Sequence, residues 1–187
     1  MNTYIDITDV VLKTNRLTLR PFHQEDLEDF YQYASVDGVG QMAGWRPHSS
    51  KEETQAILDS FVKKKKTFAL EYQGKVIGSL GIEEYNVEKF PEFNDKKCRQ
   101  LGFVLAKEHW GKGFMVEAVN EVLCYLFEDI GLDLILCGYF LKNKQSQRVQ
   151  EKCGFQPYRK SMHQTEMGDI EESVDNILRK EEWKQNN

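Results

Sequence analysis

The chain has few of the features that mark metal-binding, secreted or membrane proteins. Its four cysteines include no C-x-x-C pair, and its four histidines have no metal-ligand spacing with one another or with cysteine. No uncharged apolar run approaches the length that spans a membrane. The first ten residues carry Asp6 and Asp9 and resemble no secretory signal. We therefore expect reduced thiols, no metal, no membrane partner and a cytoplasmic location.

An excess of positive charge is also absent, because 25 Lys and Arg residues stand against 30 Asp and Glu and the formal net charge is -5. The one dense basic run, Lys63 to Lys66, falls at the end of a predicted helix, where lysines complement the negative end of the helix dipole. We therefore expect no nucleic-acid partner. The 187 residues, 40% of them hydrophobic, suit one globular domain over residues 1–187, because no linker or repeat divides them.

Short strands and helices are expected to alternate along the chain. Apolar alternation and helical spacing predict strands at 16–20, 67–72, 75–83, 99–105, 134–139 and 173–178, and helices at 27–34, 50–66, 115–130 and 146–152. Asp26 is a plausible cap of the first helix, and Ser50 with Glu53 has capping-box spacing at the second. Gln73-Gly74 predicts a tight hairpin, whereas the polar segment Tyr85 to Lys97 is expected to be an irregular connection.

The stretch from Leu101 to Ile130 is the most informative. A strand-like run leads through Trp110-Gly111-Lys112-Gly113 into a long amphipathic helix. Glycines allow successive N–H groups to point into one concavity, and the first amides of a helix attract anions such as a pyrophosphate. Many strand-to-helix turns through glycine bind no ligand, so this stretch by itself leaves both interpretations open.

Four separated blocks together resemble one known family. They are Thr14 to Pro21, Gly78 with its strand, His109 to Gly113, and Asn143-x-x-Ser146 followed by Glu151 to Phe155. The chain resembles the GNAT superfamily of N-acetyltransferases, in the branch of the ribosomal-protein alanine acetyltransferases. The resemblance implies an α/β (α+β) fold: a mixed, twisted, mostly antiparallel sheet flanked by helices, with two central parallel strands splayed apart at the coenzyme site.

The resemblance also implies acetyl-CoA as co-substrate and a set of residues that contact it. Backbone amides of Val104 and Leu105 would polarise the thioester carbonyl, and main-chain amides of the glycine turn would hold the pyrophosphate. The expected coenzyme-binding residues are Phe103, Val104, Leu105, Trp110, Gly111, Lys112, Gly113, Phe114, Met115, Val116, Asn143 and Ser146.

Two positions in this set, Trp110 and Met115, depart from the family pattern, and Met115 and Ser146 each leave two alternatives open. Trp110 stands where many relatives have Arg or Gln. Met115 replaces a usual Ala or Gly, so its side chain either crowds the phosphate or points into the core. Ser146 either touches the coenzyme or simply caps the following helix.

The acid and base of the implied reaction are less clear from the sequence. The branch often has a Glu two residues before the Gly of the coenzyme-binding strand, but this chain has Gln100 there. Glu83 is our candidate general base, with Glu84 or a water chain as alternatives; both glutamates are equally compatible with solvated edge positions. Gln150 or a neighbour occupies the region where many relatives place a Tyr acid, and no acid is assigned.

The acceptor amine is also open. The expected cleft borders, the loop around Trp45, the connection 85–97 and the segment 157–168, include several glutamates, namely Glu83, Glu84, Glu88 and Glu92. Their charge would favour a cationic acceptor, although surface acidity for solubility explains the same residues. The competing interpretation is a CoA-binding sensor or scaffold without turnover. A homodimer is a possible assembly.

Overall fold

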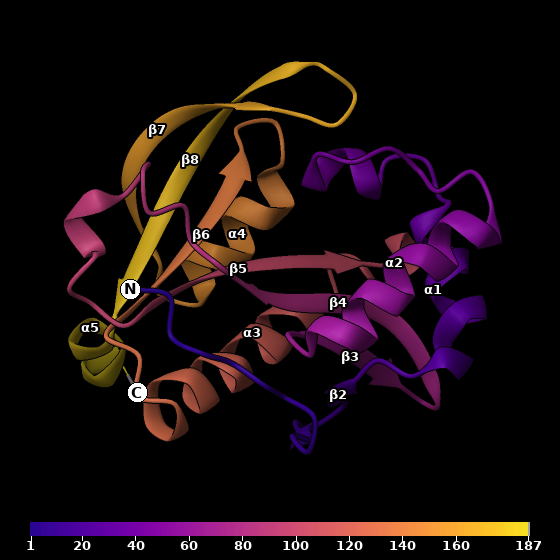
Figure 1. The fold of residues 1–187 in the computed structure, drawn as a ribbon, viewed down its shortest axis with the longest axis horizontal. Coiled ribbons are helices and arrows are strands. Elements are labelled where there is room, and N and C mark those ends of the chain that lie inside the picture. Colours follow the sequence, from indigo (N-terminus) through magenta and orange to yellow (C-terminus); the bar gives the residue numbers. More distant parts are fainter. Residues whose placement is uncertain (187) are drawn as a thin grey trace.

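One eight-stranded sheet organises the computed structural model, which describes residues 1–186 (Figure 1). Its strand order is β1–β2–β3–β4–β5–β6–β8–β7, and every neighbouring pair is antiparallel except β5 and β6. The strands are β1 (Leu12–Lys13), β2 (Thr18–Pro21), β3 (Thr67–Tyr72), β4 (Lys75–Glu83), β5 (Cys98–Leu105), β6 (Leu134–Phe140), β7 (Gln156–Gln164) and β8 (Ile170–Arg179). The expected mixed, mostly antiparallel sheet with one central parallel pair is confirmed.

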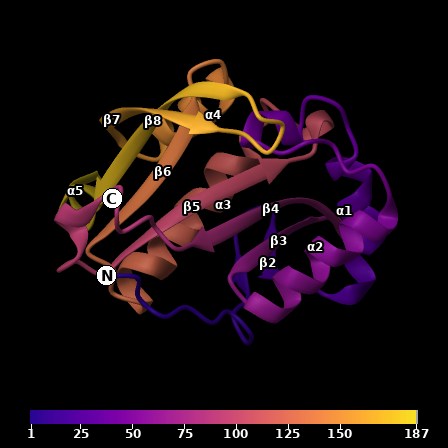
Figure 2. The ribbon, with the colours of Figure 1, turned by 45° about the horizontal axis from the view of Figure 1, so that its top comes forward.

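Helices cover both faces of this sheet (Figures 1 and 2). They are α1 (Leu27–Ala34), α2 (Lys51–Lys64), α3 (Phe114–Cys124), α4 (Lys144–Lys152) and α5 (Lys180–Asn186). A π-helical segment, Tyr125–Asp129, continues α3, and four short 3-10 turns lie at Gln24–Asp26, Gly40–Ala43, Pro91–Phe93 and Lys107–His109. No helix in the described part of the chain is long and apolar enough to cross a bilayer.

The predicted helix starts agree with the structure in one case and not in another. The Ser50 hydroxyl accepts a hydrogen bond from the Glu53 N–H at 3.2 Å, so the cap of α2 is confirmed. Asp26, in contrast, does not cap α1 with its side chain. Its carboxylate accepts from the His23 N–H and pairs with Arg20, because a 3-10 turn precedes the helix and directs Asp26 toward β2.

Strand predictions near the C-terminus were incomplete. The hairpin at Gln73-Gly74 is present, with φ of 51° and 77°, but the segment 157–168 was interpreted only as a border of the cleft. It contains most of β7, the edge strand of the sheet. Because β7 is exposed along most of its length, its sequence has no apolar alternation, and only pairing with β8 makes it a strand.

The connection between β4 and β5 packs on the sheet through its aromatic residues. Tyr85, Phe90 and Phe93 form a small buried cluster with side chains of β5, β6 and β8. The Asn86 side chain accepts from the N–H groups of Glu88 and Lys89, which fixes the chain just before Phe90. The connection is therefore ordered and holds Lys89 over the sheet.

Candidate active site

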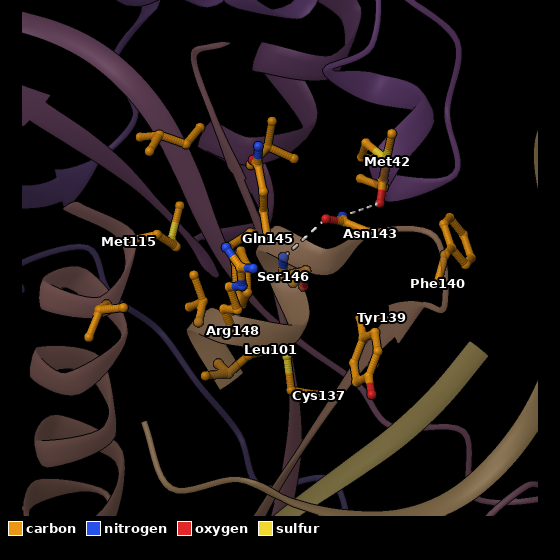
Figure 3. Close-up of a pocket in the computed structure, with 18 of the residues that line it drawn as sticks. Met42, Leu101, Met115, Cys137, Tyr139, Phe140, Asn143, Gln145, Ser146 and Arg148 are labelled. Carbon is orange, nitrogen blue, oxygen red and sulfur yellow. Dashed lines mark hydrogen bonds between the residues drawn. The ribbon is translucent and has the colours of Figure 1, made fainter. Parts of the chain in front are cut away.

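The central feature of the site is a gap between the two parallel strands. β5 and β6 are paired only from Cys98 with Leu134 to Leu101 with Cys137. Beyond these pairs the two ribbons diverge (Figure 1). A cavity of about 510 Å³ opens there, lined by the ends of both strands, the starts of α3 and α4, and the turn Gly40–Ala43 (Figure 3).

Backbone groups of β5 face this gap at alternate residues. The Cys98 N–H donates to Met1 and the Ala106 N–H to Ile77 on the β4 side, whereas the Lys97 carbonyl accepts from Leu134 on the β6 side. Because the direction alternates along a strand, even-numbered amides face β4 and odd-numbered ones face β6 or the gap.

This alternation corrects one expectation about the carbonyl-polarising amides. The N–H of Val104 points to β4, where it is used in sheet pairing, and only that of Leu105 faces the gap. The Phe103 N–H faces the gap as well. Whether odd- or even-numbered residues of β5 bond to β4 depends on the register between the two strands, and the sequence alone does not give that register.

The glycine turn leads to a helix start that no side chain caps. Gly111 and Gly113 have φ of 74° and 81°, the left-handed region that glycine adopts without strain. Gly113 is the N-cap of α3, without a side-chain hydrogen bond to the first turn. The first amides of α3 therefore point toward the cavity mouth without an intrahelical partner, which is the arrangement that binds phosphate groups.

Arg16 holds this turn from outside. Its guanidinium donates to the Lys112 carbonyl at 3.0 Å, pairs with Glu117 at 2.7 Å and lies 4.0 Å from the centre of the Phe114 ring. The carboxylate of Glu117, in the first turn of α3, also accepts from the Arg16 N–H. Sequence reasoning matched the block containing Arg16 to the family but gave it no role; the structure shows that it positions the glycine turn.

Trp110 has a structural contact that explains an aromatic residue at this position. Its indole N–H donates to the Leu105 carbonyl at 2.7 Å, which ties the end of β5 to the glycine turn. This bond occupies a carbonyl that would otherwise face the gap without a partner. His109, next to it, also lines the cavity, and burial lowers the pKa of its imidazole.

At the start of α4, the capping residue is Asn143 rather than Ser146. The Asn143 side chain accepts from the Ser146 N–H at 3.0 Å and donates to the Met42 carbonyl at 3.1 Å, as the dashed lines in Figure 3 show. Ser146 instead accepts from the Gln150 amide. Asn143 therefore joins α4 to the turn Gly40–Ala43 across the cavity, and both Asn143 and Ser146 line that cavity.

Gln150 lies in the region where the family resemblance suggests a catalytic acid. Its side chain is fully buried, donates to the Gly138 carbonyl at 3.0 Å and accepts from Asn176 at 2.9 Å. An amide held by these bonds fixes the strand β6 beside the gap and has no carboxyl or phenol proton to give.

Met115 and Cys137 form apolar parts of the cavity wall (Figure 3). Met115 is 5% exposed and packs in the main core, and its side chain also lines the cavity. Burial raises the pKa of the Cys137 thiol far above neutrality, so this residue is protonated and a poor nucleophile.

Three glycines form a row across the face of the sheet that lies away from α3. Gly81 on β4 is opposite Gly102 on β5, and Gly138 on β6 is opposite Asp175 on β8. Gly102 and Gly138 each follow the last parallel pair and so flank the gap. A Cβ on Gly102 would meet no atom within 4 Å. The row is therefore a floor without side chains.

A carboxylate stands at each end of this glycine floor. At the β4 end, a Cβ built on Gly81 would lie 2.6 Å from Glu83 Oε1, so the Glu83 carboxylate leans over that glycine. Glu83 is otherwise exposed. At the other end, Asp175 Oδ1 would be 3.6 Å from a Cβ on Gly138. Asp175 lines the cavity and is bound by the ammonium group of Lys89 at 2.7 Å.

None of the four glutamates expected to make the acceptor side acidic lines the cavity. Glu83 stands over Gly81 at the end of the glycine floor, and two of the others are paired. Glu84 binds Lys66, and Glu92 binds Tyr158 and Arg159. Among the described residues that line the cavity, Asp175 is the one carboxylate, beside several basic side chains. Surface acidity, the other interpretation that the sequence allowed, therefore explains Glu84, Glu88 and Glu92, which do not line the cavity. Within residues 1–186, no cluster of three His, Cys, Asp or Glu could hold a metal.

Comparisons with known proteins agree with this geometry. A sequence model described as "Acetyltransferase (GNAT) domain" matches residues 16–156. An uncharacterized N-acetyltransferase of Bacillus subtilis, YoaA, is 31% identical over 153 residues, 78% of this chain and 82% of that protein. A spermidine N(1)-acetyltransferase of Vibrio cholerae is 26% identical over 147 residues, 75% and 79% of the two chains.

Solved structures share the fold at lower identity. The ribosomal-protein-S5-alanine acetyltransferase of Vibrio fischeri superposes with a TM-score of 0.73 at 22% identity, over 94% of this chain and 99% of that one.

Proposed function

Since the chain belongs to the GNAT acetyltransferase family, and is an N-acetyltransferase, we propose that it moves an acetyl group from acetyl-CoA directly to a primary amine. One observation carries this proposal: the gap between β5 and β6 opens beside the uncapped start of α3. A diphosphate at the helix start and a thiol-bearing arm in the gap would both find unpaired backbone donors.

The residues present fit acetyl-CoA. The coenzyme supplies an activated acetyl thioester. The amides of Gly111 to Val116 would bind its pyrophosphate, with Arg16 holding the turn in shape. The edge of β5 at Phe103 and Leu105 would bond the amide-containing arm as a neighbouring strand does. Asn143 and Ser146, which line the cavity from α4, would border the same arm.

Acetyl transfer would proceed by direct attack of the amine on the thioester carbonyl. The Leu105 N–H, which faces the gap, is placed to donate to the oxyanion that forms there, and one such donor is worth about 3 kcal/mol of barrier. Cys137 is the thiol in the cavity wall, and its raised pKa argues against an acetylated cysteine intermediate.

A proton must leave the amine, and Glu83 stays our candidate for accepting it. Its carboxylate leans over Gly81, which neighbours Gly102 at the edge of the gap. Glu83 is also the direct cross-strand partner of Gln100, so both side chains lie on the face where the acceptor would enter. A carboxylate there would replace the base that Gln100 does not provide.

The proposed class of acceptor amine rests on the names of similar proteins. The names of two similar proteins give spermidine for one and a ribosomal-protein alanine for the other. On this basis the candidate acceptors are a small-molecule amine and a protein N-terminus. We propose an amine of one of these kinds, one acetyltransferase domain over 1–187, and action in the cytoplasm.

The test uses the glycine turn and a matched control. Gly113→Pro removes a backbone N–H and forbids the φ of 81° that the turn needs. Gly131→Pro makes the same change after the far end of the same helical segment, where φ is 73°. CoA should raise the melting temperature of the wild type and of the Gly131 variant, but not of the Gly113 variant. Equal stabilisation of both variants would contradict the pyrophosphate assignment.

Turnover is measured separately. Release of free CoA thiol from acetyl-CoA, followed over a panel of amines, should show an amine-dependent rate. Binding of CoA without thiol release across the panel would instead support a coenzyme sensor of the same fold.

A further inference from the structure

We propose that the acceptor in this reaction is an amine that also carries a carboxylate, with Lys89 binding the carboxylate and Asp175 the ammonium group. This inference rests on the proposed acetyl transfer and specifies its substrate class. It begins from one ion pair in the cavity wall, on the face of the sheet where the glycine floor lies.

The pair is built into the cavity rather than lying on the outer surface. The side chain of Asp175 is 12% exposed and that of Lys89 is 33% exposed. Lys89 donates to Asp175 Oδ1 at 2.9 Å and to the Ser161 hydroxyl at 3.1 Å. Ser161 in turn contacts Ser173, another lining residue, at 2.9 Å. The opposite charges therefore stand next to each other and both face the space that an acceptor would enter.

The pair stands beside the gap in which the thioester would lie. Asp175 is the cross-strand partner of Gly138, and Gly138 borders the gap in which the thioester would lie. An amine beside the gap thus comes first to Asp175 and then to Lys89, which reaches over Asp175 from the β4–β5 connection. In an amino acid, the amine and the carboxylate are two bonds apart through one carbon, which suits neighbouring ions.

Charge balance decides between acceptor classes. An ammonium group that displaced Lys89 from Asp175 would leave the Lys89 charge unpaired and beside a like charge, which is costly in a partly buried site. A zwitterion gives each member of the pair a new partner and leaves the net charge unchanged. The ammonium group would then lose one proton through water to Glu83, at the other end of the glycine floor, and the free amine would attack the thioester carbonyl as the CoA thiolate leaves. The described cavity lining has no second carboxylate for a polyamine, but it does carry further positive side chains, Arg148 and Lys152.

The remaining wall favours an apolar side chain. Val39, Met42 and Ala43 line the cavity from the turn Gly40–Ala43 and the residue before it, and Phe140 lines it from the end of β6. The Phe140 ring also packs against His163 in a tilted arrangement, with ring centres 5.5 Å apart. L-phenylalanine is therefore a suitable probe.

The experiment compares four acceptors that differ in charge. L-phenylalanine, L-phenylalaninamide and phenethylamine share the ring and the amine, but the last two lack the carboxylate; spermidine represents the polycations. Phenylalanine should have the highest kcat/KM, by about 10-fold or more over phenethylamine, since a hydrogen bond to a charged group is worth this much. Phenylalaninamide should also be poorer, although its amine is the weaker base and more of it is unprotonated at neutral pH.

Variants connect the preference to the pair. Lys89→Met should raise the KM for phenylalanine and bring the ratio of phenylalanine to phenethylamine close to one, whereas Lys89→Arg should keep most of the preference. Lys142→Met is the matched control, because Lys142 pairs with Glu171 outside the cavity lining. This control should leave the ratio as in the wild type. Asp175→Asn should weaken both acceptors.

Several outcomes would overturn the proposal. They are a preference for spermidine, a wild-type ratio near one, or a ratio that Lys89→Met does not change. If CoA binds but no amine releases thiol, the acetyltransferase proposal itself fails. Calorimetric titration of phenylalanine into the CoA complex then still tests whether Lys89 and Asp175 bind an amino acid. Binding that is lost in Lys89→Met supports this site, and the absence of binding to the wild type refutes it.

Discussion

Gly102 gives the sharpest test of the gap, because stability and activity should change in opposite directions. It lies within β5 outside the left-handed region, and a Cβ built there meets no atom within 4 Å. Gly102→Ala should therefore fit without a clash. Glycine in a strand interior costs about 0.5–1 kcal/mol relative to alanine, so the free energy of unfolding should rise by about this amount. For a chain of this size the melting temperature should rise by about 1–4 °C.

The same added carbon projects into the cavity, beside the place where we propose that the thioester lies. Gly102→Val adds two more methyl groups there and should hold the acetyl group or the amine out of place. Misplacement by about 1 Å costs about 100-fold in rate, so we expect a fall of this size in kcat/KM for the valine variant and a smaller one for alanine. The measurements are thermal melts with and without CoA, and thiol release with the best amine.

Coenzyme binding is the internal control in this series. The amides that we propose to bind the pyrophosphate lie in the turn after β5, so CoA should stabilise the Gly102 variants about as well as it stabilises the wild type. A valine variant with the full rate would show that the acceptor does not enter over Gly102. A variant that melts well below the wild type would show that the position is packed, contrary to the geometry.

Two further predictions concern carboxylates. Burial alone would raise the pKa of Asp26, but hydrogen bonds from Arg20 and from the His23 N–H hold it below its ordinary value. The pair's contribution to stability is therefore present above about pH 4 and is lost as the pH falls through the lowered pKa. Asp26→Asn should cost about 3 kcal/mol at pH 7 and flatten the acid side of a stability profile measured by urea unfolding; an unchanged profile would contradict this. If Glu83 is the base, Glu83→Gln should lower kcat about 100-fold at neutral pH and less in alkali, where the amine is already deprotonated. Glu84→Gln is the control, and equal rates for both variants would remove Glu83 from the mechanism.

Local chemistry made much of the site predictable. Gly111 and Gly113 have the positive φ values that the sequence favoured, since few other residues adopt them without strain. The hairpin at Gln73-Gly74 and the cap at Ser50 are likewise set by neighbouring residues. The family resemblance, carried by four separated blocks, supplied the splayed pair of strands, which no single segment shows.

Tertiary structure decided what depends on pairing between distant segments. The direction of the Val104 amide follows from which neighbour β5 meets on each side, and the exposed strand β7 exists because β8 pairs with it. The Lys89 to Asp175 pair joins residues 86 positions apart. Composition and periodicity describe the preferences of one segment. Strand register, the direction of each strand amide and ion pairs between distant residues are properties of the assembled sheet. The sequence by itself determined the glycine turn and its helix. The row of glycines and the ion pair at the proposed acceptor site were determined only when the strands came together.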